Sequence, residues 1–268
     1  MARLSGKNQH MTSLPTALPL TAILSALPEE QHGLLEQLQD ARRQTVAGRD
    51  FWSGQLHGQQ VVLALSRIGK VSASLTASVL IGHFGASRIV FTGVAGGMAS
   101  GVQVGDVVVA QNFLQHDLDA SPLFPRYEVP LYGRALFACD AALSALLADA
   151  ARQALMPGAT TGLPLPAGAR VHHGLIASGD QFIASAAGSA SLQSALRGAG
   201  HEVLAVEMEG AAVAQVCADY GVPFAAMRTI SDRADDTAHI DFPRFVTEVA
   251  SRYAQAIVNE LLRSLPAS

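Results

Sequence analysis

The sequence predicts an α/β protein of three layers, with helices on both faces of a central, twisted, mixed and largely parallel sheet. Short runs rich in Val, Ile and Ala alternate along the chain with segments whose apolar residues recur at helical spacing. The composition agrees, because 49% of the residues are hydrophobic and only 15% are charged. Continuous apolar runs of this kind are typical of parallel sheets, in which the strands are buried on both faces.

The first half of the chain contains three predicted strands, a hairpin and two predicted helices. A hairpin is indicated where His57 and Gly58 separate "FWSGQL" from "QVVLALS". The other strands are short apolar runs, and the helices are longer segments with apolar residues three and four positions apart. In chain order we expect a strand over Leu20–Ala26, a helix over Glu29–Arg42, the hairpin, a helix over Lys70–Phe84, and strands over Arg88–Gly93 and Asp106–Gln111.

The second half continues the alternation after a loop rich in proline and aromatic residues, Gln115–Gly133. A helix rich in Ala and Leu follows to about Leu155, and a surface linker spans Met156–Gly168. The remaining elements are predicted as strand Arg170–Ser178, a short helix within Ser185–Arg197, strand Val203–Val206, helix Glu209–Tyr220, strand Pro223–Ile230 and a closing helix, Phe242–Leu265.

The N-terminal segment loosely imitates a secretory signal, since Arg3 and Lys7 precede an apolar stretch that ends at Leu27. Two prolines, Pro15 and Pro19, interrupt that stretch, and Pro-Glu-Glu stands where a cleavage site should be. We therefore expect residues 1–18 to be a poorly structured tail and residues 19–268 to form a single domain. No run approaches the ~20 apolar residues of a membrane span.

Composition also restricts the possible partners. A formal net charge of −4 provides no basic surface for nucleic acid. The two cysteines, Cys139 and Cys217, lie far apart and lack the CxxC spacing of a metal site, so ordinary reduced thiols in a cytoplasmic protein are expected.

Several acidic residues follow predicted strands, at the edge of the sheet where open α/β proteins bind ligands. Glu29 and Glu30 follow the first strand, Glu207 and Glu209 the strand that ends at Val206, and Asp232 the next strand. Each has an ordinary explanation as a helix-start charge or a turn former. Together at one sheet edge they would repel one another unless one is protonated or a polar ligand uses them. The set favours acid/base chemistry on a polyhydroxylated substrate.

The glycine-rich stretch "TGVAGGMASG" (Thr92–Gly101) matches neither a phosphate-binding P-loop nor a GxGxxG dinucleotide loop. A tight turn that lets a ligand approach the backbone is the better interpretation. GxSxG and HExxH do not occur, so the sequence does not support a serine hydrolase or a zinc protease.

Four stretches, "TGVAGG", "LIASGDQFIAS", "AVEMEGAAVAQVCADYGVPFAAMRTISD" and "AHIDFPRF", resemble the 5′-methylthioadenosine/S-adenosylhomocysteine nucleosidases of the nucleoside phosphorylase superfamily. The resemblance runs from about Leu20 to Leu265. It implies the nucleoside phosphorylase-like form of the predicted fold and a small nucleoside as substrate, with neither metal nor organic cofactor. It also implies a homodimer in which the loop of residues 115–133 lies near the partner's pocket.

The resemblance assigns the proton chemistry to two residues. Asp232 matches the acid that protonates adenine N7, with Ser231 beside it, and Glu30 matches the general base for the attacking water. Arg228 matches a residue near that water. Glu209 matches the carboxylate that binds the ribose hydroxyls.

The other matching positions are expected to bind the substrate. Met208 lies against the sugar in such a site, and Phe182 and Ile183 match the pair that stacks on adenine and binds its edge. Phe242, with Leu27 and Ile68, fits the wall of the 5′-alkylthio pocket. Glu207 either orients the strand end or touches the edge of the site, and we do not expect it to be catalytic.

Phosphate ligands decide between a hydrolase and a phosphorylase. Related phosphorylases carry arginines after the first strand and before the glycine turn, and a hydroxyl inside it, where this chain has Pro28–Glu30, Phe91 and Val94. Water is therefore the expected nucleophile. Val94 and Leu27 depart from the Ser or Thr and the Met usual in the nucleosidases, which leaves the preferred 5′ substituent open. A futalosine-type nucleosidase, a purine nucleoside phosphorylase and a non-catalytic adenosine-binding protein remain alternatives.

Overall fold

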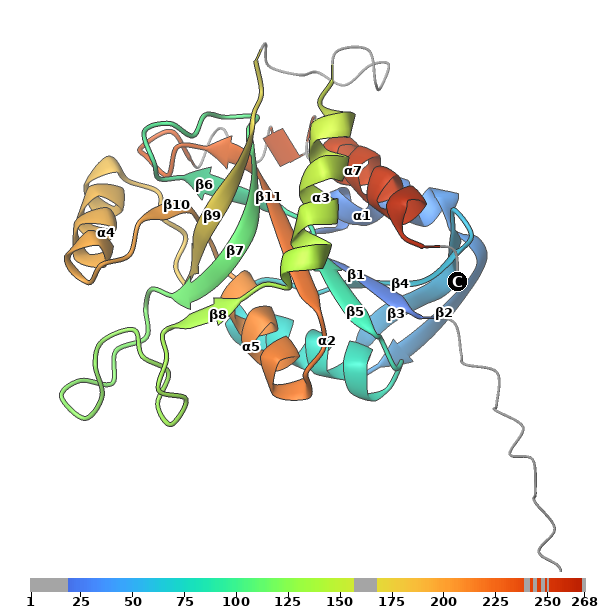
Figure 1. Ribbon diagram of the computed structural model, residues 1–268, viewed down its shortest axis with the longest axis horizontal. Helices are drawn as coiled ribbons and strands as arrows, with labels where there is room; N and C mark the ends of the chain where they lie inside the picture. The colour runs from blue at the N-terminus through green and yellow to red at the C-terminus, as the bar shows by residue number, and fades with distance from the viewer. Residues whose placement is uncertain are drawn as a thin grey trace, which may run out of the picture.

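A computed structural model describes residues 19–156, 168–238, 242, 245–246, 249 and 251–266 (Figure 1). The strands are β1 (Thr21–Ser25), β2 (Gln39–Val46), β3 (Arg49–Leu56), β4 (Gln59–Leu65), β5 (Arg88–Phe91), β6 (Val94–Gly97), β7 (Val107–Gln115), β8 (Leu136–Ala138), β9 (Val171–Ser178), β10 (Val203–Glu207) and β11 (Phe224–Asp232). The helices are α1 (Pro28–Gln37), α2 (Lys70–Gly82), α3 (Ala141–Ala154), α4 (Ala186–Gly198), α5 (Gly210–Tyr220) and α7 (Ser251–Ser264).

The strands form one 11-stranded sheet in the order β2-β3-β4-β1-β5-β11-β6-β10-β9-β7-β8, with an additional pairing between β11 and β7. That pairing closes β11, β6, β10, β9 and β7 into a ring, while β1 to β5 extend from β11 as an open sheet (Figure 1). Six of the eleven pairings are parallel, so the sheet is mixed and mainly parallel as expected. Strand β11 belongs to both parts.

Helices cover both faces of the open sheet, as the sequence predicts. Side chains along a strand point alternately to opposite faces. In β1, Ile23 packs in the cluster that contains residues of α1, α3 and α7, whereas Leu24 packs in the cluster that contains residues of α2 and α5. Figure 1 shows the two groups of helices on opposite sides of the strands. Helix α4 covers a third cluster beside the ring, through Leu196.

The predicted hairpin is confirmed. Strands β3 and β4 pair in antiparallel fashion across His57 and Gly58. Both residues have positive φ, at 50° and 77°, which is the backbone twist that tight hairpin turns require.

Two parts of the first half differ from expectation. The helix predicted to reach Arg42 ends at Gln37, and residues 39–46 form β2. Because β2 is an edge strand and mostly exposed, it lacks the alternation by which a half-buried strand is recognised. The glycine stretch expected to be a turn contains a short strand, β6, between β11 and β10.

In the second half, β7 continues to Gln115, past the expected end at Gln111, and the unexpected strand β8 pairs with this extension. The expected tail 1–18, most of the linker 156–168 and part of the closing helix lie outside the described residues. Within the described ranges, no helix has the length and apolar character needed to cross a membrane.

Helix α5 begins in close contact with the sheet. A Cβ atom added to Gly210 would lie 2.1 Å from Cε1 of Phe113, a fully buried residue of β7. The absence of a side chain at Gly210 therefore lets the first turn of α5 approach β7, and it places the preceding Glu207–Glu209 segment at the end of the ring.

We predict that Gly210→Ala destabilises the protein by roughly 1–3 kcal/mol, because a tightly packed site must shift to admit the methyl group. Urea unfolding monitored by circular dichroism measures the change. Gly101→Ala is the matched control, since a Cβ there meets nothing within 4 Å. An equal effect of the two substitutions would contradict the packing role of Gly210.

Candidate active site

The residues predicted to form the site line one cavity of about 340 Å³. Residues at the carboxyl ends of β1, β10 and β11 line it, although β10 runs opposite to β11, so these ends do not form a single edge of the sheet. The predicted residues in its lining are Leu27, Glu30, Ile68, Phe182, Ile183, Glu207, Met208, Glu209, Arg228, Ser231, Asp232 and Phe242.

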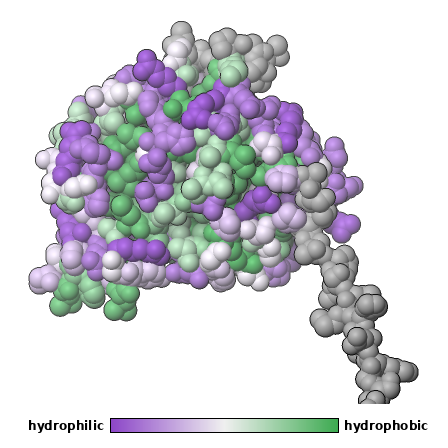
Figure 2. Space-filling model, in the orientation of Figure 1, coloured by the Kyte–Doolittle hydropathy of each residue, from purple (hydrophilic) through white to green (hydrophobic). Residues whose placement is uncertain are grey.

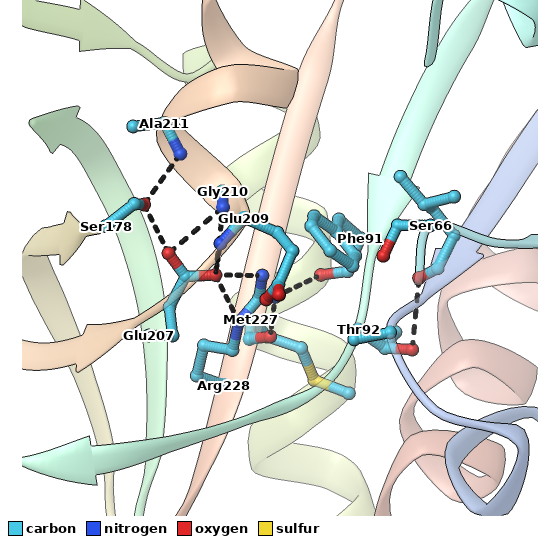
Figure 3. A network of polar contacts seen from close by, with 12 residues as sticks. Ser66, Phe91, Thr92, Ser178, Glu207, Glu209, Gly210, Ala211, Met227 and Arg228 are labelled. Carbon is cyan, nitrogen blue, oxygen red and sulfur yellow. Dashed lines mark hydrogen bonds and ion pairs between the residues drawn. The ribbon is translucent and has the colours of Figure 1, made fainter. Parts of the chain in front are cut away.

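Glu207 and Arg228 form a buried ion pair at the base of this cavity (Figure 3). The carboxylate accepts hydrogen bonds from Nη2 and Nε of Arg228 at 2.7 and 3.2 Å, and from the amide of Gly210 at 2.9 Å. The hydroxyl of Ser178 also donates to it, while accepting a hydrogen bond from the amide of Ala211 at 2.7 Å. Glu207 is thus committed to protein partners and holds the start of α5.

Arg228 is similarly committed. Its Nη1 atom donates to the carbonyls of Met227 at 2.9 Å and Phe91 at 3.3 Å, and its guanidinium lies 4.1 Å from the centre of the Phe91 ring. Only 1% of the residue is exposed. Its positive charge therefore remains in the protein interior, beside the carboxylates of the cavity.

Glu209 lies two residues after Glu207 and has a different environment. Its Oε1 atom accepts a hydrogen bond from the amide of Gly69 at 2.8 Å. Burial, and next the negative charge of Glu207, raise the pKa of Glu209 to about 8. Gly69 has φ 91°, which only glycine adopts readily. Sequence reasoning did not identify Gly69 as part of the site.

Glu30 enters the cavity from the first turn of α1. Its Oε2 atom accepts hydrogen bonds from the amides of Ala26 at 2.8 Å and Leu27 at 3.0 Å. The other oxygen, Oε1, is buried and has no hydrogen-bond partner among the described residues. Burial raises the pKa of Glu30, against the opposing effects of the Leu27 amide and the charge on Arg228. A buried carboxylate with one unpaired oxygen is suited to accept a proton.

Asp232 lies at the end of β11 and is only 2% exposed. Its Oδ2 atom accepts a hydrogen bond from the hydroxyl of Ser231 at 2.8 Å, and its Oδ1 atom accepts one from the amide of Ala234 at 2.8 Å. These two bonds fix the carboxyl group at the wall of the cavity.

The glycine turn brings the backbone close to both acids, a role that the sequence did not reveal. A Cβ atom on Gly93 would lie 3.3 Å from Oε1 of Glu30, and one on Gly96 would lie 3.0 Å from Oδ1 of Asp232. The turn was expected to admit a ligand to the backbone. Its glycines also leave space beside the two carboxyl groups.

The opposite side of the lining is apolar. The rings of Phe182 and Phe242 meet edge to face, with centroids 5.5 Å apart. Phe182 is 48% exposed and Ile68 is 58% exposed, so this part of the wall also faces solvent. Among the described residues, no group of three His, Cys, Asp or Glu side chains is arranged to hold a metal ion.

Comparison with known proteins identifies the family. The model of the phosphorylase superfamily matches residues 21–263. The chain belongs to this superfamily. Within it, the chain is 37% identical over 258 residues to the 5′-methylthioadenosine/S-adenosylhomocysteine nucleosidase of Mycobacterium bovis, an alignment that covers 91% of this chain and 96% of the relative. The predicted family and fold are therefore confirmed.

Solved structures of the superfamily agree. The corresponding nucleosidase from Neisseria meningitidis, in complex with methylthio-immucillin-A, is 35% identical with a TM-score of 0.82, covering 92% of this chain and all of that chain (100%). The futalosine hydrolase of Helicobacter pylori is 32% identical with a TM-score of 0.80, covering 92% of this chain and 99% of that chain. Both activities that the sequence suggested for a hydrolase occur among these superfamily members.

We predict that loss of the negative charge lowers the free energy of unfolding at Glu207 but not at Glu209. Glu207→Gln leaves the buried Arg228 without its counter-ion and should destabilise the protein by about 3 kcal/mol or more. Glu209→Gln is the matched variant and should not destabilise the protein at pH 7, because burial already disfavours its charge. Urea unfolding of both variants without substrate measures the difference, and equal losses would contradict the assignment.

The stability of the wild-type protein should also depend on pH through Glu209. A carboxyl group whose pKa rises from its ordinary 4.5 to about 8 on folding favours the folded state when protonated. This contribution is complete below pH 4.5 and is lost as the pH rises to about 8, by at most about 1.4 kcal/mol per pH unit. Unfolding of wild type and Glu209→Gln at several pH values should therefore show a gap that widens over this range and is constant above it.

Proposed function

We propose that the protein hydrolyses the N-glycosidic bond of 5′-methylthioadenosine or S-adenosylhomocysteine, releasing adenine and the 5-thio-ribose product. The observation that carries this proposal is the buried, unpaired Oε1 atom of Glu30 in the cavity that also contains Asp232 and Glu209. A protein that only binds adenosine has no need for a buried base of this kind.

The reaction uses these three carboxyl groups in distinct roles. Asp232 donates a proton to adenine N7, so that the base leaves as a neutral molecule when the bond from C1′ to N9 breaks. Glu209 accepts hydrogen bonds from the ribose hydroxyls, which favour its charged form when substrate is bound, and it then stabilises the positive charge that develops on the sugar. Oε1 of Glu30 takes a proton from the water whose oxygen bonds to C1′.

The remaining lining residues position the substrate. The ring of Phe182 stacks on adenine, and the backbone of Ile183 binds the edge of the base. Met208 lies against the ribose. Phe242, Leu27 and Ile68 form the apolar wall that accepts the alkylthio group. Apolar contact with this group favours a thioether over a charged 5′ substituent.

Water rather than phosphate is the nucleophile. The charged residues in the described lining are one arginine, Arg228, and four acidic residues, Glu30, Glu207, Glu209 and Asp232. The arginine is already paired with Glu207. A phosphate ion beside Glu30 would be repelled without a free cation to bind it.

We further propose a homodimer, with the segment 115–133 near the partner's pocket. Two large apolar side chains in this segment are almost fully exposed, Leu123 at 84% and Leu131 at 91%. Figure 2 shows hydrophobic atoms gathered at the tip of the segment between β7 and β8. Exposed apolar surface of this kind is typical of protein interfaces. Light scattering after gel filtration tests this; a monomer at micromolar concentration would contradict it.

Product analysis tests the proposed reaction. The purified protein is incubated with methylthioadenosine, S-adenosylhomocysteine or futalosine, each with and without phosphate, and the products are separated by chromatography. Free adenine and a thio-ribose should form at a rate independent of phosphate. A sugar 1-phosphate would identify a phosphorylase, preference for futalosine would identify the sister hydrolase, and tight binding without turnover would indicate a binding protein.

We predict that Asp232→Asn and Glu30→Gln each lower kcat/KM for methylthioadenosine by about 10²-fold to 10⁴-fold, the usual contribution of a general acid or base. Glu36→Gln is the matched control, since Glu36 is an exposed residue on the same helix as Glu30. Spectrophotometric adenine release measures the rates, and circular dichroism verifies folding. Near-normal rates in either acid variant would overturn its assignment.

A further inference from the structure

A second cavity, of about 440 Å³, shares no lining residue with the first. It lies between the first turns of α1, the turn that joins β2 to β3, and the end of β4. Its lining consists of Pro28, Glu29, Gln31, Leu35, Gly48, Arg49, Asp50, Trp52, Leu65 and Arg67. The function proposed above uses none of them.

Gln31 provides a buried donor without an acceptor. Only 6% of this residue is exposed, and its Nε2 atom has no hydrogen-bond partner among the described residues. Leaving a buried amide donor unpaired costs folding free energy. A ligand atom that accepts a hydrogen bond would remove that cost.

Two arginines give the cavity positive charge. Arg49 is 9% exposed, and its Nε donates to the hydroxyl of Thr76 at 2.9 Å. Arg67 donates to the carbonyl of Gly48 at 2.5 Å. After burial, the charge on Arg67 is the next cause that lowers the pKa of Arg49, so the two cations act on each other.

Of the nearby carboxylates, Asp50 acts on Arg67: hydrogen bonds from Arg43 and Thr45, and also the charge of Arg67, lower the pKa of Asp50, whereas burial and the charge of Arg67 lower the pKa of Arg49. Asp50 accepts hydrogen bonds from Arg43 at 2.6 Å and from the hydroxyl of Thr45 at 2.6 Å. Glu29 and Arg67 are both exposed to solvent, where their fields are screened. The buried charge of Arg49 therefore favours an anion in the interior of the cavity.

The backbone of Arg67 is held in an unfavourable conformation. Its φ of 61° lies in the left-handed region, in which glycine is much less costly than arginine. The side chain is exposed, so packing in the core does not require an arginine at this position. Strain of this kind tends to be retained where a side chain has a function.

The rest of the lining is apolar and includes one flat surface. Trp52 is partly buried, and Leu35 and Leu65 lie in the same lining. These side chains can bury a small aromatic or aliphatic group.

We propose that this cavity binds a small organic carboxylate with a flat apolar body. The carboxylate accepts hydrogen bonds from Arg49, Arg67 and Nε2 of Gln31, and the apolar body packs on Trp52. This proposal is independent of the reaction at the first cavity.

Trp52 supplies a direct test, because it is the one tryptophan of the sequence. Its fluorescence is measured while phenylacetate is added to the intact protein. A ligand of this size is expected to bind with a Kd on the order of 1 mM. Phenylacetamide, which has the same body without the charge, and inorganic phosphate, which has charge without the body, are the comparison ligands. Saturable quenching by phenylacetate alone supports the proposal.

Two variants identify the site. Arg67→Gly removes a cation and suits the local backbone, whereas Gln31→Leu removes the unpaired donor with little change in size. Each should weaken phenylacetate binding by about tenfold or more. Arg152→Gln is the charge-matched control on α3, outside the cavity lining, and should leave binding unchanged. Circular dichroism shows that each variant is folded.

The proposal is overturned if phenylacetate causes no quenching at about tenfold above the expected Kd, or if quenching survives in both variants. Equal binding of phenylacetamide would show an apolar pocket without anion recognition. Equal binding of phosphate would show an anion site that does not use the apolar wall. Either result would also overturn it.

Discussion

The buried ion pair between Glu207 and Arg228 is the interaction on which the candidate active site depends. It joins the end of β10 to β11, and through Gly210 and Ser178 it fixes the start of α5 and the end of β9. Removing two charges from water is unfavourable unless each is fully hydrogen-bonded, and here both are. Because Glu207 is held by these partners, the roles proposed for a substrate fall to the other acids of the lining, Glu209, Glu30 and Asp232.

The ring of strands explains how these acids come together from distant parts of the sequence. The carboxyl ends of β1, β10 and β11 all reach the cavity, although β10 runs opposite to β11, and each end supplies one of these three acids. The two glycines at Gly93 and Gly96 allow the intervening turn to pass close to Glu30 and Asp232. The close approach of the glycine turn to Glu30 and Asp232 therefore helps to determine the geometry of the site.

The sequence predicted the fold class, the hairpin and the position of the acids, because strand periodicity and turn residues are local properties. The residue pattern by itself did not separate Glu207 from Glu209, which have the same chemistry and lie on one short segment; only the resemblance to the nucleosidases gave them different roles. Their difference arises from partners 21 and 29 positions away from Glu207, and from Gly69, 140 positions away from Glu209. For the same reason the orphan oxygen of Glu30 could not be foreseen. Strand β6 escaped detection because its glycines favour turns.

The polar residues that made β2 hard to recognise in the sequence also protect the molecule against aggregation. β2 lies at the open edge of the sheet, and seven of its eight residues are exposed. An unpaired edge can accept a strand from another molecule and so begin aggregation. Arg42 and Arg43 place charge along this edge, and a second chain that added there would have to bring these charges together. The charged side chains of β2 thus protect this open edge of the sheet against the addition of further strands. Near the other end, β7 pairs with β11 and closes the ring.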